Sequence, residues 1–304
     1  MSLFYSVRQF EEMEMKSALP LWRQILNASA EESGITPAQS LEKMGAALDA
    51  MLAADADYDP GQSSHSRLIG GDAERMRRYV ASGETICGDF VGRVITGAIR
   101  MGECNACMHR IVAAPTAGAC GVMPAVLLPY AQDHGTPREE LIAALYIAAG
   151  FGMVIASRAS MSGAEAGCQA EIGTASAMAA AALVYLHGGN AQQMSAAVAI
   201  ALKNMMGLVC DPVAGLVEVP CVKRNAAGAM NALGAAEMAL AGIRSRIPAD
   251  EVIDAMRAVG ALMVRFCARR ARAASPPPRQ RYASATISLE NNEGLPIWTK
   301  RRSV

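Results

Sequence analysis

Three of the eight cysteines stand among polar residues, in segments whose composition is typical of loops. Cys168 lies in SGAEAGCQAE, Cys210 comes directly before Asp-Pro, and Cys221 lies in VPCVKRN. Thiolates in such segments are candidate metal ligands. Their spacing matches neither ferredoxins nor zinc ribbons, so three ordinary buried cysteines remain the alternative interpretation.

A set of three thiolates without an obvious fourth fits one kind of cofactor. A 4Fe-4S cluster held by three cysteines has one iron open to oxygen ligands, and an open iron can act as a Lewis acid on a hydroxyl leaving group. Removal of an α-proton with departure of that hydroxyl gives an enamine, which hydrolyses to a keto acid and ammonia. The pattern is compatible with a dehydratase of hydroxy amino acids, and it does not identify the general base.

Other patterns that could carry chemistry are weaker. Cys104 and Cys107 form a CxxC without a second pair at zinc spacing, which favours incidental packing over a metal or redox role. The sequence contains neither a Walker loop nor GxGxxG, so phosphate and dinucleotide binding have little support. The four histidines stand in no recognisable nucleophile setting; they are His65, His109, His134 and His187.

Four Gly-rich segments are the predicted active-site loops, because their glycines allow the backbone to approach a ligand closely. They are IGGD at 69–72, APTAGACG at 114–121, SMSGAEAGCQAEIG at 160–173 and CDPVAGLVEVPCVKRN at 210–225.

Helices must position these loops, and three helix starts are legible. Thr36-Pro37-Ala38-Gln39 combines a capping threonine, a proline at the first helical position and a glutamine at the third. Thr136 precedes a similar arrangement, for which we predict a helix that ends at Gly150. Asn190 is predicted to cap a helix that reaches Met206 and stops at Gly207.

The composition favours an all-α protein with closely packed helices. Hydrophobic residues make up 52% and aromatic residues only 5%, because Ala, Met, Leu and Val dominate. The uncharged stretches 141–157 and 172–202 are rich in Ala and Gly, so we expect buried core helices and no membrane span. Lys and Arg number 28 against 28 for Asp and Glu, which argues against nucleic acid and anionic membranes as partners.

The N-terminal segment has early acidic residues and no long apolar run, so we expect a cytoplasmic protein without a secretory signal. In that compartment the cysteines are expected to stay reduced.

Three long motifs together resemble the bacterial iron-sulfur L-serine dehydratase α-chain: IVAAPTAGACGVMPAVLL, SGAEAGCQAEIGTASAMAAAALV and ALKNMMGLVCDPVAGLVEVPCVKRNAAGAMNAL. The resemblance runs from about Phe4 to Met263. It implies an all-α catalytic domain that converts L-serine to pyruvate and ammonia without pyridoxal phosphate. It also implies a 4Fe-4S cluster with Cys168, Cys210 and Cys221 as ligands.

The resemblance further implies a β-chain as partner and a set of substrate-binding residues. Backbone amides of the Gly-Gly-Asp and APTAG loops are expected to bind the substrate carboxylate, and polar residues beside the cysteines are expected to orient the substrate. A helix cap or a solvated surface charge is the alternative role for the polar residues. The expected substrate-binding residues are Gly70, Gly71, Asp72, Pro115, Thr116, Gly118, Ser162, Lys203 and Asn225.

The chain also departs from the family pattern. Ile69 replaces the usual Thr, Arg67 and His109 replace Gly, and Cys107 replaces Ser. After Met263 the sequence becomes basic and Pro-clustered, and residues 272–280, RAASPPPRQ, permit GGLAATPT in a shifted reading frame, as in family α-chains. We therefore predict a catalytic domain at 1–263 and a disordered tail at 264–304 that is read out of frame.

Two other functions remain open on the sequence. A related cluster-dependent L-cysteine desulfidase or L-threonine deaminase would use the same ligands on another substrate. A chain that binds the cluster but is inactivated by its altered C-terminus is the alternative that is not an enzyme.

Overall fold

The computed structural model describes residues 3–273, and these residues form helices and loops without a strand. The predicted all-α class is confirmed. In chain order the elements are α1 (Arg8–Lys16), α2 (Leu21–Glu32), α3 (Pro37–Ala56), α4 (Asp72–Ala81), α5 (Gly88–Ala106), the 3-10 turn η1 (Ala117–Ala119), α6 (Val122–His134), α7 (Arg138–Arg158), α8 (Gly163–Ala166), α9 (Cys168–Leu186), α10 (Ala191–Met205), the 3-10 turn η2 (Val213–Gly215), α11 (Cys221–Leu240) and α12 (Ala249–Ala273).

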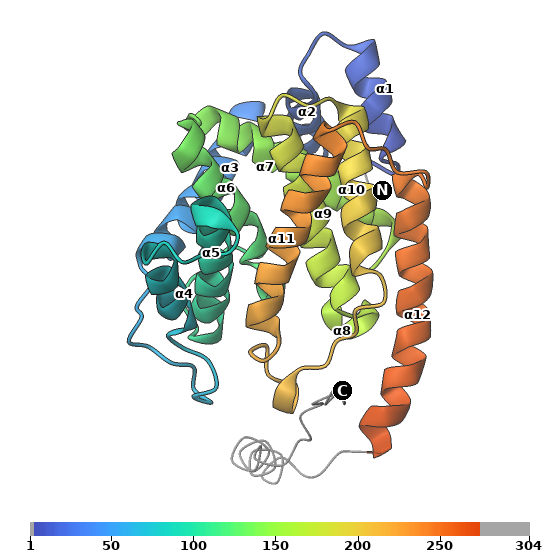
Figure 1. Cartoon of the computed structure of the whole chain (residues 1–304). Coiled ribbons are helices and arrows are strands. Elements are labelled where there is room, and N and C mark those ends of the chain that lie inside the picture. Colours follow the sequence, from blue (N-terminus) through green and yellow to red (C-terminus); the bar gives the residue numbers. More distant parts are fainter. Residues whose placement is uncertain (1–2, 274–304) are drawn as a thin grey trace, which may run out of the picture.

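Helix α9 is the central element, and α7, α10 and α11 pack directly around it (Figure 1). Between residues 168 and 184 every side chain of α9 is buried except that of Glu171. The run of small alanines lets neighbouring backbones come close while excluding water, so burial on all sides replaces the usual amphipathic pattern.

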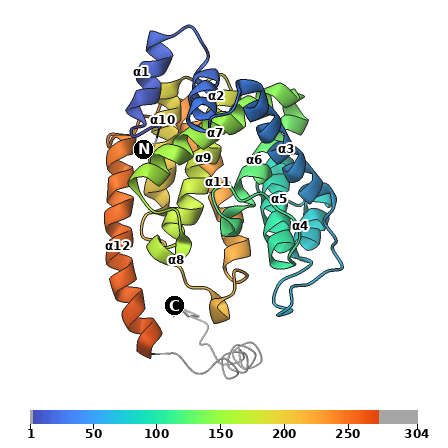
Figure 2. The ribbon, with the colours of Figure 1, turned by 180° about the vertical axis from the view of Figure 1, so that it is seen from behind.

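The remaining helices form an outer layer. Helix α5 packs against α11 on one side and α4 covers α5. Helix α12 runs along α10 at the opposite edge, and α2 and α3 cover α7, as the view from behind shows (Figure 2). The N-terminal ends of α9 and α11 lie at the same end of the bundle as α8 (Figure 1). The loops with candidate chemistry are therefore gathered at one end.

Two of the three predicted helix starts are confirmed. Thr36 accepts a hydrogen bond from the Gln39 amide and completes a capping box at α3, and Asn190 does the same with Gln193 at α10. The prediction for Thr136 is wrong, because Pro137 occupies the cap position of α7 and no side chain caps this end.

Helix α7 also corrects the predicted stop at Gly150, because it continues to Arg158. Gly150 is a packing position: a Cβ there would lie 2.7 Å from Ile25 Cδ1 on α2 and 3.2 Å from Phe10 Cζ on α1. By length and composition α7 is apolar enough to cross a membrane, yet 67% of its apolar window is buried within the bundle. A core helix satisfies the same criterion.

The predicted domain boundary at Met263 falls inside α12, which remains helical to Ala273. The rest of the predicted tail, residues 274–304, lies outside the described residues.

Candidate active site at the helix ends

The three candidate ligands come from separate segments and meet at one end of the bundle. Cys168 is the first residue of α9, Cys221 is the first residue of α11, and Cys210 lies in the loop that follows α10. The three side chains lie close enough to act on one another electrostatically: Cys210 acts on Cys168, Cys221 on Cys210, and Cys168 on Cys221. The tertiary structure therefore brings together three thiols that are far apart in sequence.

The thiols lie in a largely buried environment. Burial raises the pKa of Cys168 and of Cys221 to about 11, while the nearby Arg224 guanidinium acts in the opposite direction on both. Burial, together with Cys221, also raises the pKa of Cys210. Without a metal the three thiols are protonated at neutral pH, so binding of metal must release their protons.

Arg224 fixes the position of the cysteine loop. Its Nη1 donates to Cys168 Sγ at 3.2 Å and to the Val209 carbonyl at 3.1 Å, and it pairs with Asp211 Oδ1 at 2.6 Å. An N–H donor to a ligand sulfur is typical of the groups that orient cysteines around iron-sulfur clusters.

These donors fit a cluster better than a single ion. Among residues 3–273 no group of three or more His, Cys, Asp or Glu side chains is arranged to hold one metal ion. A 4Fe-4S cluster is bound through several irons, so its cysteines need not meet at one point. The positive ends of α9 and α11, where Cys168 and Cys221 stand, favour anionic thiolates and an anionic cluster.

Gln169 anchors the loop that carries Cys210, a role that the sequence analysis missed. Its side chain is buried, accepts from the Gly207 amide at 2.8 Å and donates to the Met256 carbonyl at 3.0 Å. Its own amide donates to the Leu208 carbonyl at 2.9 Å. The glutamine that follows Cys168 thus ties the loop after α10 to both α9 and α12.

The Gly-Gly-Asp loop supplies open backbone donors. Gly70 and Gly71 have φ values of +148° and +76°, which glycine adopts readily, and a Cβ at Gly70 would lie 2.5 Å from the Gln62 carbonyl oxygen. Within the described part of the chain, neither amide makes a hydrogen bond. Two adjacent free N–H groups in a left-handed turn can bind an anion such as a carboxylate.

Asp72 joins this loop to α11, because its Oδ2 pairs with Lys223 Nζ at 3.1 Å. Burial disfavours the ionised carboxyl, but the bonds from Lys223 and Arg75 outweigh burial and hold the pKa of Asp72 below its usual value. The aspartate is therefore ionised and already paired. Its role as a substrate-binding side chain stays a prediction.

The APTAG loop lies against Glu171. The Thr116 hydroxyl donates to Glu171 Oε1, and a Cβ at Gly118 would lie 2.6 Å from that oxygen. From the other side, a Cβ at Gly163 would lie 2.6 Å from Oε2. Two glycines thus leave room for one carboxylate, and among residues 3–273 no cation pairs with it.

Sequence reasoning missed Glu171, although it is the one residue of α9 between 168 and 184 that is not buried. The signal was its position, one turn after Cys168 in a helix that is otherwise apolar. Its charge acts on all three candidate ligands and raises their pKa values, after the larger effect of burial. The carboxylate therefore lies between the cysteines and the APTAG loop.

Asn225 is buried and its amide is fully used by the protein. Its Nδ2 donates to the carbonyls of Gly118 and Cys221 at 2.9 and 3.1 Å, and its Oδ1 accepts from the Gly121 amide at 2.9 Å. The side chain joins the APTAG loop to the first turn of α11. It thus holds the predicted substrate loop beside a candidate cluster ligand, while direct substrate contact stays a prediction.

Glu218 forms a further bridge that the sequence did not reveal. This buried carboxylate in the cysteine loop accepts hydrogen bonds from Ser64 Oγ at 2.9 Å and from Ser66 Oγ. Both serines precede the Gly-Gly-Asp loop, and Ser64 also accepts from the Ile69 amide at 3.3 Å. The bridge couples the cysteine loop to the candidate carboxylate-binding loop.

Comparisons with known proteins identify the family of this chain. The family described as "Serine dehydratase alpha chain" matches residues 16–270. The chain belongs to the serine dehydratase α-chain family. It is 46% identical over 261 residues to the "Probable L-serine dehydratase, alpha chain" of Bacillus subtilis (strain 168), covering 86% of this chain and 87% of the relative. It is 40% identical over 260 residues to the "L-serine dehydratase, alpha chain" of Peptoniphilus asaccharolyticus, covering 85% and 89%.

In this member of the family, the side chains of three predicted substrate residues make no hydrogen bond or ion pair within the described residues. Pro115 is the second residue of the APTAG loop, directly before Thr116. Ser162 stands at the cap position of α8, and its amide donates to Ser160 Oγ at 3.1 Å. Lys203 is exposed in the last turn of α10. Within the described residues none of the three side chains is hydrogen-bonded to a cysteine, and their binding roles stay predictions.

Arg67, where the family usually has Gly, has a φ of +62°. This left-handed conformation is favourable for glycine and strained for arginine. Ile69, in place of the usual Thr, is buried beneath the same loop.

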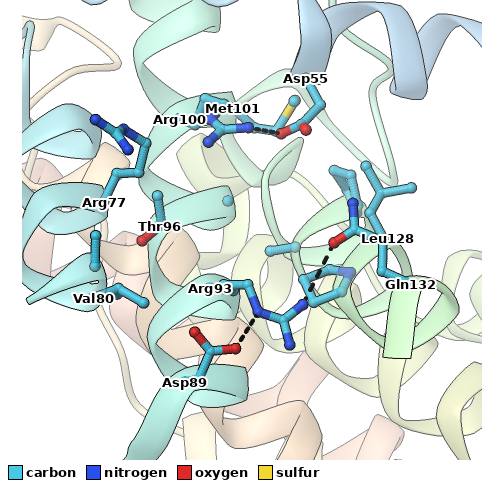
Figure 3. Close-up of a pocket in the computed structure, with 15 residues that line it drawn as sticks. Asp55, Arg77, Val80, Asp89, Arg93, Thr96, Arg100, Met101, Leu128 and Gln132 are labelled. Carbon is cyan, nitrogen blue, oxygen red and sulfur yellow. Dashed lines mark hydrogen bonds and ion pairs between the residues drawn. The ribbon is translucent and has the colours of Figure 1, made fainter. Parts of the chain in front are cut away.

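A separate cavity of about 320 Å³ is lined by residues of α3, α4, α5 and α6 (Figure 3). Its charged side chains are mostly paired within the protein: Arg93 with Asp89 and Asp133, and Arg100 with Asp55. None of the predicted site residues lines it.

Proposed function

We propose that the chain is the catalytic α-chain of an iron-sulfur L-serine dehydratase, which converts L-serine to pyruvate and ammonia. The observation that carries this proposal is the convergence of Cys168, Cys210 and Cys221 beside two loops with anion-binding and acidic groups. The family membership and the names of the relatives support L-serine as the substrate.

The three cysteines would hold a 4Fe-4S cluster, and Arg224 would donate to the Cys168 sulfur. When bound, such a cluster supplies an open iron that acts as a Lewis acid on the hydroxyl that leaves the substrate. The residues of this chain then have to place a zwitterionic amino acid, and the site contains a complementary group for each of its charges.

The substrate carboxylate fits the amides of Gly70 and Gly71, because neither amide donates a hydrogen bond to another described residue. The substrate ammonium fits Glu171, the acidic side chain that lies between the cysteines and the APTAG loop without a cationic partner among the described residues. Thr116 fixes one carboxylate oxygen by donating its hydroxyl. Two oppositely charged contacts would orient the amino acid before its α-proton is removed.

A β-chain is proposed as the partner, because the relatives from Bacillus subtilis and Peptoniphilus asaccharolyticus are named α-chains. L-Threonine and L-cysteine are the competing substrates. Relative rates of keto acid formation from serine, threonine and cysteine, measured with a β-chain present, distinguish a serine dehydratase from a threonine deaminase or a desulfidase.

The first experiment is visible absorption of the full chain after anaerobic loading with iron and sulfide. We expect a broad sulfur-to-iron charge-transfer band that weakens in each of Cys168→Ser, Cys210→Ser and Cys221→Ser. Cys104→Ser is the matched control, because Cys104 is also buried but contacts the Ala54 carbonyl, outside the site.

No iron uptake by the folded chain would contradict the cluster proposal. A band that survives all three substitutions would show that other residues are the ligands. A cluster without turnover of any of the three amino acids, in the presence of the β-chain, would support an inactive cluster-binding chain.

A further inference from the structure

Glu103 is a buried acid that holds the start of α4 from a neighbouring helix. It lies near the end of α5, with 1% of its surface exposed. Its Oε1 accepts from the Asp72 amide at 2.7 Å and its Oε2 from the Ala73 amide at 3.3 Å. Oε2 also accepts from the Tyr58 hydroxyl at 2.5 Å. One carboxylate thus collects three hydrogen bonds, two of them from the first turn of α4.

This arrangement is costly by itself. A buried carboxylate loses its hydration, and within residues 3–273 Glu103 forms no ion pair that would offset the loss. The donors and the positive end of α4 stabilise the charge instead. A neutral residue of the same size would avoid the cost of removing a charge from water. The presence of a carboxylate therefore indicates that the start of α4 must be placed accurately.

The placement matters because α4 begins directly after the Gly-Gly pair. Glu103 takes the amides of Asp72 and Ala73, which would otherwise compete for an anion at the helix end. The amides of Gly70 and Gly71 are left as the free donors of this turn. The carboxylate therefore separates the donors used for structure from the donors left for a ligand.

We propose that Glu103 is a positioning residue for the substrate carboxylate: through the Asp72 and Ala73 amides it sets the orientation of the Gly70 and Gly71 amides that bind it. The inference rests on the proposed function. Glu103 acts through the backbone of α4 and does not touch the substrate.

Tyr58 supports Glu103 on the side away from the loop. Burial and the bond to Glu103 raise the pKa of Tyr58, so its hydroxyl stays a donor. The Arg100 guanidinium lies 5.7 Å from the Tyr58 ring centre and is 2.8 Å from Asp55 Oδ1. The close-up of the neighbouring cavity shows the pair of Arg100 and Asp55 (Figure 3). The ring is thus held in place by a cation that does not itself neutralise Glu103.

The test uses the full chain, loaded with iron and sulfide and mixed with a β-chain, and compares wild type with Glu103→Gln. Glutamine keeps the volume but cannot accept at both positions. We expect KM for L-serine to rise about tenfold, the effect of losing one hydrogen bond to a charged group, with kcat within about threefold. Inhibition by L-alanine, which keeps the carboxylate, should weaken by the same factor. Inhibition by L-alaninamide, which lacks the carboxylate, should not change.

Glu140→Gln is the matched control. Glu140 lies on α7 and, like Glu103, accepts a hydrogen bond from a tyrosine hydroxyl, that of Tyr185 at 3.0 Å. It should leave KM and both inhibition constants unchanged. If Glu103→Gln does not fold, Tyr58→Phe decides in the same way, with an expected rise of about threefold for L-serine and L-alanine.

An unchanged KM, or equal weakening of L-alanine and L-alaninamide, in the folded variant would overturn the positioning role. The band of the cluster serves as a second readout and should match that of wild type. A wild-type enzyme that does not turn over L-serine would instead refute the proposed function.

Discussion

The fit between Gly118 and Glu171 gives the sharpest prediction about the site. Gly118 lies in η1 and its φ is outside the left-handed region, so alanine is compatible with the backbone there. The obstacle is steric: the new Cβ would lie 2.6 Å from Glu171 Oε1 and 3.0 Å from Cδ. Relief of this contact requires the carboxylate to move, which disturbs the hydrogen bond that Thr116 donates to it.

The expected magnitude follows from two opposing effects. Overpacking of this kind costs about 1–3 kcal/mol of unfolding free energy. Replacing glycine by alanine gains about 0.4–1 kcal/mol, because the unfolded chain loses conformational freedom. Gly118→Ala should therefore destabilise the protein by about 1–2 kcal/mol. With Glu171→Ala present the obstacle is gone, so the same substitution should be neutral or stabilising by up to about 1 kcal/mol.

Urea unfolding followed by far-UV circular dichroism measures both steps of this double-mutant cycle, without need of the cluster. Gly234→Ala on α11 is the control, because a Cβ there meets nothing within 4 Å. It should stabilise both backgrounds equally, by about 1 kcal/mol. If Gly118→Ala costs the same with and without Glu171, the carboxylate does not lie against the APTAG loop and its assigned role in the site fails.

Three further predictions test the loops around the site. Asp72→Asn removes a carboxyl whose pKa is lowered from 3.8 by folding. The contribution of this carboxyl to stability is complete above about pH 4 and is lost as the pH falls, so the difference in unfolding free energy between wild type and variant, measured in urea, should narrow in acid. A difference that stays constant with pH would contradict the pairing with Lys223. Arg67→Gly relieves a φ of +62° and should raise the unfolding free energy by about 0.5–1 kcal/mol, whereas a loss would show that the arginine side chain has stabilising contacts. Arg224→Met removes the donor to Cys168 and should speed loss of the cluster band to a chelator by about 10–100-fold, while an unchanged rate would exclude a role in holding the cluster.

The sequence predicted the features that depend on neighbouring residues. The capping boxes of α3 and α10 involve side chains only three positions apart, so local spacing was sufficient to place both helix starts. The all-α class followed from the scarcity of aromatic residues and the abundance of alanine. The resemblance of the loop motifs also indicated the family, which the comparisons confirm.

Predictions based on local signals failed where packing overrides them. Gly150 was interpreted as a helix stop, but α7 continues because glycine is needed where Ile25 and Phe10 pack against it. Thr136 was interpreted as a cap, but α7 begins after Pro137 without a side-chain cap. Glycine and threonine have several structural uses, and only the neighbouring helices decide between them.

The sequence predicted the cysteine and glycine motifs of the site, but not the acidic side chains that support them. Sequence alone picked out three cysteines and the Gly-rich loops, because cysteines and glycines in polar segments are unusual enough to notice. It assigned no role to Glu103, Glu171 or Glu218, since an acid in a helix or loop is ordinarily a solvated surface residue. Only the tertiary structure buries Glu103 and Glu218 and places Glu171 between two glycines, because most of their partners lie far away in the chain.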